Sequence, residues 1–485
     1  MKNLKQKGID AFLWDFLGKI AIHGSTFIIG IILARLLEPS DFGMIAILMI
    51  IVALASIFSD IGLGGALIQR KKVLEIHYSS VFYFNISIGL LLTLITFFSA
   101  SFLANFYENP TLIPLIEVMS LLFTVSAFHT VQTVILRKDL NYKRLTQVNL
   151  KASIISGIVG VFLAFFGFGV WSLIAQVFMR ELMINIFIWY QSTWKPTFKF
   201  SLKALQELWG FGFNLFLSHL IHTIYEKLDF LVIGKLFTAT ILGYFYQAKQ
   251  LNTFIVTFIS NSLMSVLFPL LSKIQDDLAR FQRVTITSLN LLIFITFLVL
   301  GELYIISDEL IFLLLGEKWL ESIPYFKILI LSGFAFPISA LMVDILSSLG
   351  ESKLLLKLEI YKKFIEASTL IILYLYGIEP FLYAIVLTST VNTILNMHYS
   401  MKKIKLPLFT TGVKPLLIQM TIVVTTVLLC QYLLEFLIVA PFWLLLIKSI
   451  LFITLYLITN WILKTETFTY TLKEFKSIKR IKNDK

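Results

Sequence analysis

The stretch that decides the fold runs from Ala34 to Lys72 and reads ARLLEPSDFGMIAILMIIVALASIFSDIGLGGALIQRKK. It predicts the end of one apolar helix, a turn at residues 38–41, a second apolar helix and a basic exit at residues 70–72. Pro39 cannot continue a helix, and it biases Glu38 toward an extended conformation. The sequence therefore predicts a helical hairpin with one sharp polar turn.

The same plan returns 200 positions later in the chain. The segment Gly234-Lys235-Leu236-Phe237 aligns with residues 34–37, and Gly243 aligns with Gly43. The basic Lys273 also falls close to the equivalent of residues 70–72. A pair of helices with one polar turn, reused at a fixed offset, predicts two structurally related halves.

Composition predicts an all-α polytopic membrane protein. Of the 485 residues, 58% are hydrophobic and only 14% are charged. Apolar runs of about 20 residues recur along the chain, and each is long enough to cross a hydrocarbon core of roughly 30 Å as a helix. We expect fourteen spans, near residues 16–37, 42–67, 80–104, 112–135, 149–167, 169–190, 211–237, 242–271, 284–306, 323–349, 358–377, 381–398, 415–437 and 441–463.

The first apolar run and the single cysteine are both expected to have ordinary structural roles. The first apolar run lacks a small-residue cleavage pattern, so we expect no removable signal peptide. One cysteine, Cys430, excludes a disulfide framework and a multi-cysteine metal site, and it is expected to be a packing or lipid-facing residue.

Basic residues predict the orientation. With a cytoplasmic N-terminus, 29 Lys and Arg residues outside the spans fall on the cytoplasmic side, and three (Arg35, Lys235 and Lys318) fall on the other. This is a strong positive-inside pattern, and it predicts that both termini lie in the cytoplasm. The net charge of +12 is explained by topology and does not indicate nucleic-acid binding.

The repeat and the span count predict four parts. Residues 1–195 form an N-terminal half with six expected spans, and residues 196–405 form a C-terminal half with six more. Residues 406–463 add spans thirteen and fourteen, and residues 464–485 form a basic cytoplasmic tail that rests on anionic headgroups or is solvated and disordered.

Motif inspection argues against an enzyme. The sequence carries no phosphate loop, nucleophile elbow or metal-ligand cluster, and no long hydrophilic insert that could hold a catalytic domain. We therefore predict no catalytic residues, no metal and no cofactor.

The most informative polar residues lie in the expected seventh span. His219, His222, Glu226 and Asp229 recur at intervals of three and four, which places them on one helix face. A central ionised side chain costs about 2.5–3.5 kcal/mol on insertion scales, so this face must avoid lipid. We predict that it lines an aqueous cavity and carries coupling protons or sodium ions.

Other candidates are spread over several spans. Lys19 and His23 form a thinner version of the same face in the first span. Asp60 is a gate candidate, and Gly62, Gly64 and Gly65 close behind it allow close helix approach or local unwinding. For Asp60, an ion pair with Arg70 is an equally good reading. The cations predicted to line the cavity and bind an anionic headgroup are Arg180, Lys249, Lys227 and Arg35, and Lys327 also lies near a span. The alternative is that Arg180 pairs with a nearby carboxylate and the histidines form interhelical hydrogen bonds.

Four segments resemble a known family. ARLLEPSDFGMIAI (34–47) and DIGLGGALIQRK (60–71) are similar to the N-terminal signature of bacterial polysaccharide flippases, of the O-antigen (Wzx) type. DFLVIGKLFTATILGYFYQAKQL (229–251) and LLLGEKWLESIPYFKIL (313–329) resemble the second-half motif and the outer-loop motif of that family. The family is part of the multidrug/oligosaccharidyl-lipid/polysaccharide exporter superfamily.

The resemblance implies a fold and a function. The fold has two six-helix bundles with a V-shaped cleft, two additional C-terminal helices and alternating access. The function is to flip an undecaprenyl-diphosphate-linked oligosaccharide to the outer leaflet during envelope polysaccharide (O-antigen or exopolysaccharide) synthesis. The partners are this substrate, membrane lipids and other polysaccharide assembly proteins. The alternatives are a multidrug exporter of the same superfamily, a flippase for the peptidoglycan precursor, and a membrane polysaccharide polymerase.

Overall fold

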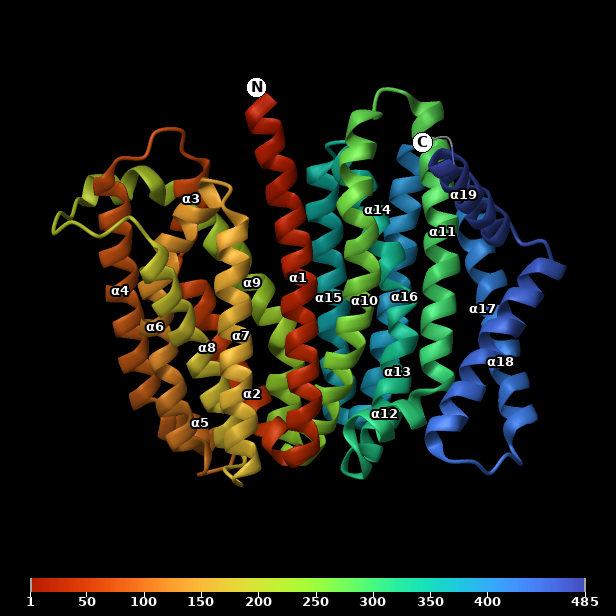
Figure 1. Ribbon diagram of the computed structural model, residues 1–485, viewed down its shortest axis with the longest axis horizontal. Helices are drawn as coiled ribbons and strands as arrows, with labels where there is room; N and C mark the ends of the chain where they lie inside the picture. The colour runs from red at the N-terminus through yellow and green to blue at the C-terminus, as the bar shows by residue number, and fades with distance from the viewer. Residues whose placement is uncertain (1, 484–485) are drawn as a thin grey trace. The chain divides into compact units, whose positions relative to one another are not determined.

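A computed structural model describes the backbone of residues 2–483 and the side chains of residues 14, 17–210, 212–257, 259–260, 264 and 267–474. The described backbone consists of helices and the turns and loops that connect them (Figure 1). Helices are expected here because a spanning segment must satisfy its own backbone hydrogen bonds in lipid. The prediction of an all-α polytopic protein is confirmed.

The chain divides into two compact units, Met1–Tyr246 and Gln247–Lys485. The first unit contains α1 (Lys2–Leu36), α2 (Pro39–Phe58), α3 (Leu63–Gln69), α4 (Glu75–Phe98), α5 (Ala100–Phe106), α6 (Leu112–Lys138), α7 (Tyr142–Phe165), α8 (Val170–Gln191), α9 (Leu202–Leu236) and the start of α10 (Ala239–Lys273). Helices α4, α6, α7 and α8 pack side by side, and α9 packs on α2, α3 and α4.

The second unit holds the rest of α10 and the remaining helices. They are α11 (Leu278–Ile305), α12 (Ser307–Leu315), η1 (Glu317–Ser322), α13 (Ile323–Gly333), α14 (Phe336–Ser348), α15 (Ser352–Tyr376), α16 (Ile378–Lys403), η2 (Phe409–Val413), α17 (Lys414–Leu434), α18 (Pro441–Ile462) and α19 (Glu466–Asn483). Helices α17 and α18 form a hairpin that packs on α11. Cys430 is buried in α17.

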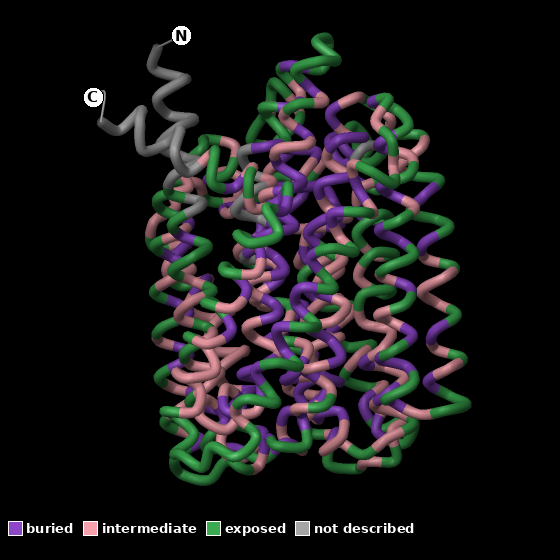
Figure 2. Tube along the Cα trace, turned by 90° about the vertical axis from the view of Figure 1, so that its right-hand side faces the viewer, coloured by how far each residue is buried: buried purple, intermediate pink, exposed green. Residues whose placement is uncertain are grey.

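Helices occupy all fourteen expected ranges, but the number of membrane crossings stays a prediction. Eleven helical segments in the described part of the chain are long and apolar enough to cross a membrane. Helices α9, α10 and α15 are not among these eleven. Figure 2 shows exposed and buried residues alternating along the same helices, as expected when one helix face packs and the other meets lipid.

Compact units and repeat halves are different divisions of the chain. The expected bundle boundaries after residues 195 and 405 describe repeats, whereas the compact units divide between Tyr246 and Gln247. Since α9 packs against α2, α3 and α4, it belongs to the first compact unit. The repeat boundaries stay a prediction.

The turn at residues 38–41 has the structure that its sequence predicts. Pro39 is the first residue of α2, where its missing N–H costs nothing. Glu38 is extended, and its backbone N–H donates to Asp41 Oδ2 at 3.0 Å. At the equivalent turn before α10, the Ile241 N–H donates to Thr238 Oγ1 at 3.3 Å. Both turns are thus closed by a side-chain cap.

The two repeated turns pack on each other through the aligned glycines. A Cβ atom on Gly43 would lie 1.7 Å from the carbonyl oxygen of Ala239, and one on Gly243 would lie 1.8 Å from that of Pro39. Each of these contacts becomes the other when both of its residues are replaced by their equivalents 200 positions away in the sequence. The backbones of α2 and α10 therefore cross in direct contact, and only glycine fits at either position.

The predicted unwinding near Asp60 is present. Between α2 and α3 the chain makes a turn in which Ile61 and Gly62 have φ of 45° and 68°, a left-handed conformation that favours glycine. A Cβ on Gly62 would also lie 2.0 Å from the carbonyl oxygen of Gly212 in α9. Close approach and unwinding therefore occur together in one apolar segment.

Candidate functional site: charged residues within the spans of the first unit

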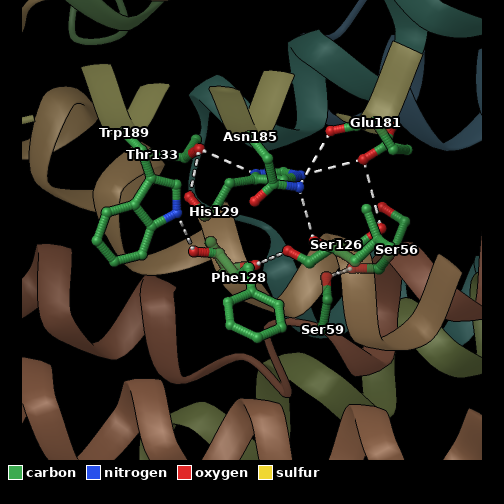
Figure 3. Close-up of polar contacts among 11 residues, drawn as sticks. Ser56, Ser59, Ser126, Phe128, His129, Thr133, Glu181, Asn185 and Trp189 are labelled. Atoms are coloured by element: carbon green, nitrogen blue, oxygen red, sulfur yellow. Dashed lines mark hydrogen bonds and ion pairs between the residues drawn. The ribbon is translucent and has the colours of Figure 1, made fainter. Parts of the chain in front are cut away.

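A connected polar cluster joins α6 to α8. Glu181 Oε2 lies 3.0 Å from His129 Nε2 and accepts a hydrogen bond from Ser126 Oγ at 3.4 Å (Figure 3). The side chains of His129 and Glu181 are only 16% and 22% exposed. In this apolar setting each polar group needs a partner, and these two partner each other.

The cluster follows from four-residue spacing on α8. Glu181, Asn185 and Trp189 lie on one face, which packs against α6. Asn185 Nδ2 donates to the Val125 carbonyl at 2.8 Å, and Trp189 Nε1 donates to the Phe128 carbonyl at 3.1 Å. Three successive turns of α8 are therefore hydrogen-bonded to α6.

Arg180 is adjacent in sequence but lies about 100° away around the helix. It is half-buried, and its Nε atom is shielded from solvent with no hydrogen-bond partner among the described residues. Its charge acts on Glu181, yet no ion pair to Arg180 occurs within the described part of the chain. Its cavity role stays a prediction.

The predicted face of α9 is accessible. His219, His222 and Glu226 are exposed, and Asp229 is half-buried. Glu226 is 54% exposed; its Oε2 lies 3.9 Å from His222 Nδ1, and its Oε1 lies 3.3 Å from Lys227 Nζ. Lys227 Nζ also lies 5.6 Å from the centre of the Phe230 ring. The accessible face of α9 thus presents an exposed carboxylate between two basic groups.

Asp60 caps a helix. Its Oδ1 accepts a hydrogen bond of 2.5 Å from the Gly64 N–H at the start of α3. Arg137 and His219 interact electrostatically with it, so α2, α6 and α9 contribute to its environment. Arg70 bonds instead to Glu207 Oε2, through Nη2 at 2.5 Å. Whether Asp60 also acts as a gate stays a prediction.

The remaining candidates are separate from the α6–α8 cluster. Lys19 and His23 on α1 and Arg35 at its end are exposed, while Lys249 on α10 is half-buried and belongs to the second unit. Lys327 on α13 pairs with Asp308. Within the described part of the chain, no group of three or more His, Cys, Asp or Glu side chains could hold a metal ion.

The sequence reasoning missed Glu181 on α8 and two ion pairs on α15. Glu181 follows Arg180 directly, and the spacing from it to Asn185 could have indicated a helix–helix contact. In α15, Lys362 is buried and bonded to Glu359, and Lys363 Nζ lies 2.7 Å from Glu366 Oε2. The signal was available there as opposite charges three residues apart within an expected span.

The helical spans define a multi-pass membrane protein. The solved structure of the lipid II flippase MurJ in an inward closed conformation superposes with a TM-score of 0.72 over 94% of this chain and 98% of that one, at 17% identity. This likeness shows the fold.

Sequence comparison gives the family. Residues 32–324, more than half of the chain, match the family described as polysaccharide biosynthesis protein, and the chain belongs to it. The lipopolysaccharide biosynthesis protein WzxC of Escherichia coli (strain K12) is 23% identical over 83% of this chain and 82% of its own length. The succinoglycan biosynthesis transport protein ExoT of Rhizobium meliloti (strain 1021) is 26% identical over 70% of this chain and 69% of its own.

The family match confirms the resemblance seen in segments 34–47, 60–71, 229–251 and 313–329. These relatives and the structural neighbour are described as biosynthesis, transport and flippase proteins, not as enzymes. The interpretation of the chain as a membrane transporter rather than an enzyme agrees with them.

Proposed function

We propose that this protein flips an undecaprenyl-diphosphate-linked oligosaccharide from the cytoplasmic to the outer leaflet of the bacterial plasma membrane by alternating access, with both termini in the cytoplasm. The observation that carries the proposal is an incompletely paired cation, Arg180, inside an apolar span of a polysaccharide biosynthesis family member. An intramembrane ionisable residue is retained at a cost, which function must justify.

Moving a diphosphate headgroup across the membrane requires a cation such as Arg180 within the spans. A diphosphate headgroup cannot cross hydrocarbon alone, because an isolated ion there costs on the order of tens of kcal/mol. Arginine binds phosphate oxygens through paired N–H donors. We propose that Arg180, with Lys227, Lys249 and Arg35, lowers this barrier while the isoprenoid tail stays in lipid.

The driving force is proposed to act through the face of α9. An inside-negative potential favours outward movement of an anion by about 2.3 kcal/mol per charge per 100 mV. Glu226 and Asp229 can add coupling by exchanging protons or sodium ions, and His219, His222, Lys19 and His23 can share that role. No other cofactor is needed for this mechanism.

The test uses a deletion strain and the lipid-linked intermediate that it accumulates. We expect build-up of an undecaprenyl-diphosphate oligosaccharide on the cytoplasmic leaflet, which wild type reverses. Arg180→Ala should lower the flipping rate at least about tenfold, since a hydrogen bond to a charged group contributes about 1.5–3 kcal/mol. Glu226→Ala should also fail to restore flipping.

Arg144→Ala, which removes an exposed arginine at the start of α7, is the matched control and should restore flipping fully. Unchanged intermediates together with new sensitivity to cationic drugs would favour a multidrug exporter instead. Accumulation of the peptidoglycan precursor would favour that flippase, and accumulation of already flipped but unpolymerised units would favour a polymerase. Full rescue by both Arg180→Ala and Glu226→Ala would keep a flippase and reject this site.

A further inference from the structure

The second unit contains a pocket that the proposed flipping mechanism does not use. It has a volume of about 490 Å³ and is lined by residues of α11, α12, η1, α13 and α16. We call it the outer pocket, because the positive-inside pattern assigns the segment 307–322 to the outer face. Its polar lining consists of Tyr304, Asp308, Lys327, Glu379 and Tyr383.

The wall of the outer pocket is held in place by the core. The segment 307–322, expected as a loop, folds into α12 and η1. Gly316 turns the chain between them with φ of 95°, and Trp319 is completely buried. On α12, Glu309 pairs with Lys448 of α18 at 2.7 Å in a largely buried contact. Asp308 is therefore presented from an anchored helix, as a preformed binding site requires.

The charges in the outer pocket do not suit a phosphate. Lys327 Nζ lies 2.8 Å and 2.9 Å from the two oxygens of Asp308 and 6.0 Å from the centre of the Tyr304 ring. Its charge is thus neutralised by a neighbour, and the exposed Glu379 leaves the pocket with one net negative charge. A diphosphate would be repelled.

The remaining chemistry suits a sugar ring. Two tyrosines supply apolar faces with polar tips, and Tyr383 is 56% exposed. Carboxylates accept hydrogen bonds from hydroxyl groups, and the Lys327–Asp308 pair offers both a donor and an acceptor. Side chains of η1 and α13 add an aliphatic wall, as in typical small-ligand sites, and the volume lies in their usual range.

We propose that the outer pocket binds one neutral or amino-substituted hexose unit of the glycan after that unit has reached the outer face. This inference rests on the proposed flippase function, but sugar binding by the purified protein can be measured without any flipping. The expected role is to hold the sugar part outside while the diphosphate is released.

The test is saturation-transfer NMR on the full-length protein in nanodiscs. The probes are methyl glucoside, methyl galactoside, N-acetylglucosamine and glucosamine, with inorganic pyrophosphate and tetraphenylphosphonium as competitors. We expect saturable binding of at least one sugar that pyrophosphate does not displace. Tyr383→Ala and Glu379→Gln should each raise its Kd about tenfold, equivalent to about 1.4 kcal/mol.

Tyr376→Ala is the matched control, because Tyr376 is 70% exposed on α15 and does not line the pocket. It should leave the Kd unchanged. No sugar binding by wild type, equal binding by Tyr383→Ala, or binding of tetraphenylphosphonium alone would each overturn the proposal.

Flipping in cells separates two sources of the sugar. If Tyr383→Ala loses sugar binding and also slows flipping, the sugar is carried on the lipid. If sugar binding is lost and flipping is unchanged, the pocket takes lipid-free glycan. Both results uphold the sugar site, and the second leaves the proposed flippase function intact.

Discussion

Gly43→Ala is expected to destabilise the protein by about 1–3 kcal/mol or more, although alanine is the better helix former by about 1 kcal/mol. The new methyl group would lie 1.7 Å from the Ala239 carbonyl oxygen, and that atom is backbone that cannot rotate away. The two helices must then move apart and lose the contacts around the crossing. The measurement is the thermal midpoint of the detergent-solubilised protein.

The chain offers a matched control in Gly30. A Cβ atom there would meet nothing within 4 Å, so Gly30→Ala should be neutral or slightly stabilising. Gly243→Ala should resemble Gly43→Ala, because its Cβ would lie 1.8 Å from the Pro39 carbonyl oxygen. The double variant should cost clearly less than the sum of the two, since one substitution already separates the helices. Additive effects, or a stable Gly43→Ala variant, would contradict a direct backbone crossing.

Glu181→Ala is expected to cost about 1–3 kcal/mol, the usual effect of leaving a shielded polar group without its hydrogen-bond partner. It leaves His129 without its 3.0 Å partner and removes the carboxylate nearest in sequence to Arg180. Both groups would then stay desolvated without compensation. Unfolding in a denaturant series, followed by tryptophan fluorescence, measures the loss.

A double-mutant cycle with His129→Ala isolates the pair. We expect a coupling free energy of about 0.5–3 kcal/mol between residues 129 and 181, and the double variant should be more stable than Glu181→Ala alone if the orphaned imidazole is the main penalty. Glu226→Ala is the contrast, because the exposed Glu226 should affect flipping with a stability change of at most about 0.5 kcal/mol. Equal destabilisation by the two glutamate variants would refute the assignment of Glu181 as structural and Glu226 as accessible.

The internal repeat explains why Gly43→Ala and Gly243→Ala are expected to have similar effects. The pairs Pro39 with Ala239 and Gly43 with Gly243 are both separated by 200 residues, and they meet at one crossing. An offset in sequence thus corresponds to a near-symmetric contact in space. Internal repeats of this kind are common in transporter folds.

Much of this protein was determined by local sequence. Apolar runs of spanning length, Pro39 in a polar turn and glycines beside Asp60 were enough to predict the helices, the sharp turn and the unwound segment. These features depend on backbone sterics and on the need to satisfy hydrogen bonds within each span, and both act over a few residues. Short segments were also enough to recognise the family, because their sequences reflect these local backbone constraints.

Partnerships between helices were decided only by the tertiary structure. His129 and Glu181 lie 52 residues apart, Glu309 and Lys448 lie 139 apart, and no local pattern specifies which polar residues will meet. An ion pair between Asp60 and Arg70 was one of two equally good readings of the sequence, but Arg70 bonds to Glu207 while Asp60 caps α3. The reason is physical: a buried polar group needs a partner, but which one it finds depends on how the helices pack.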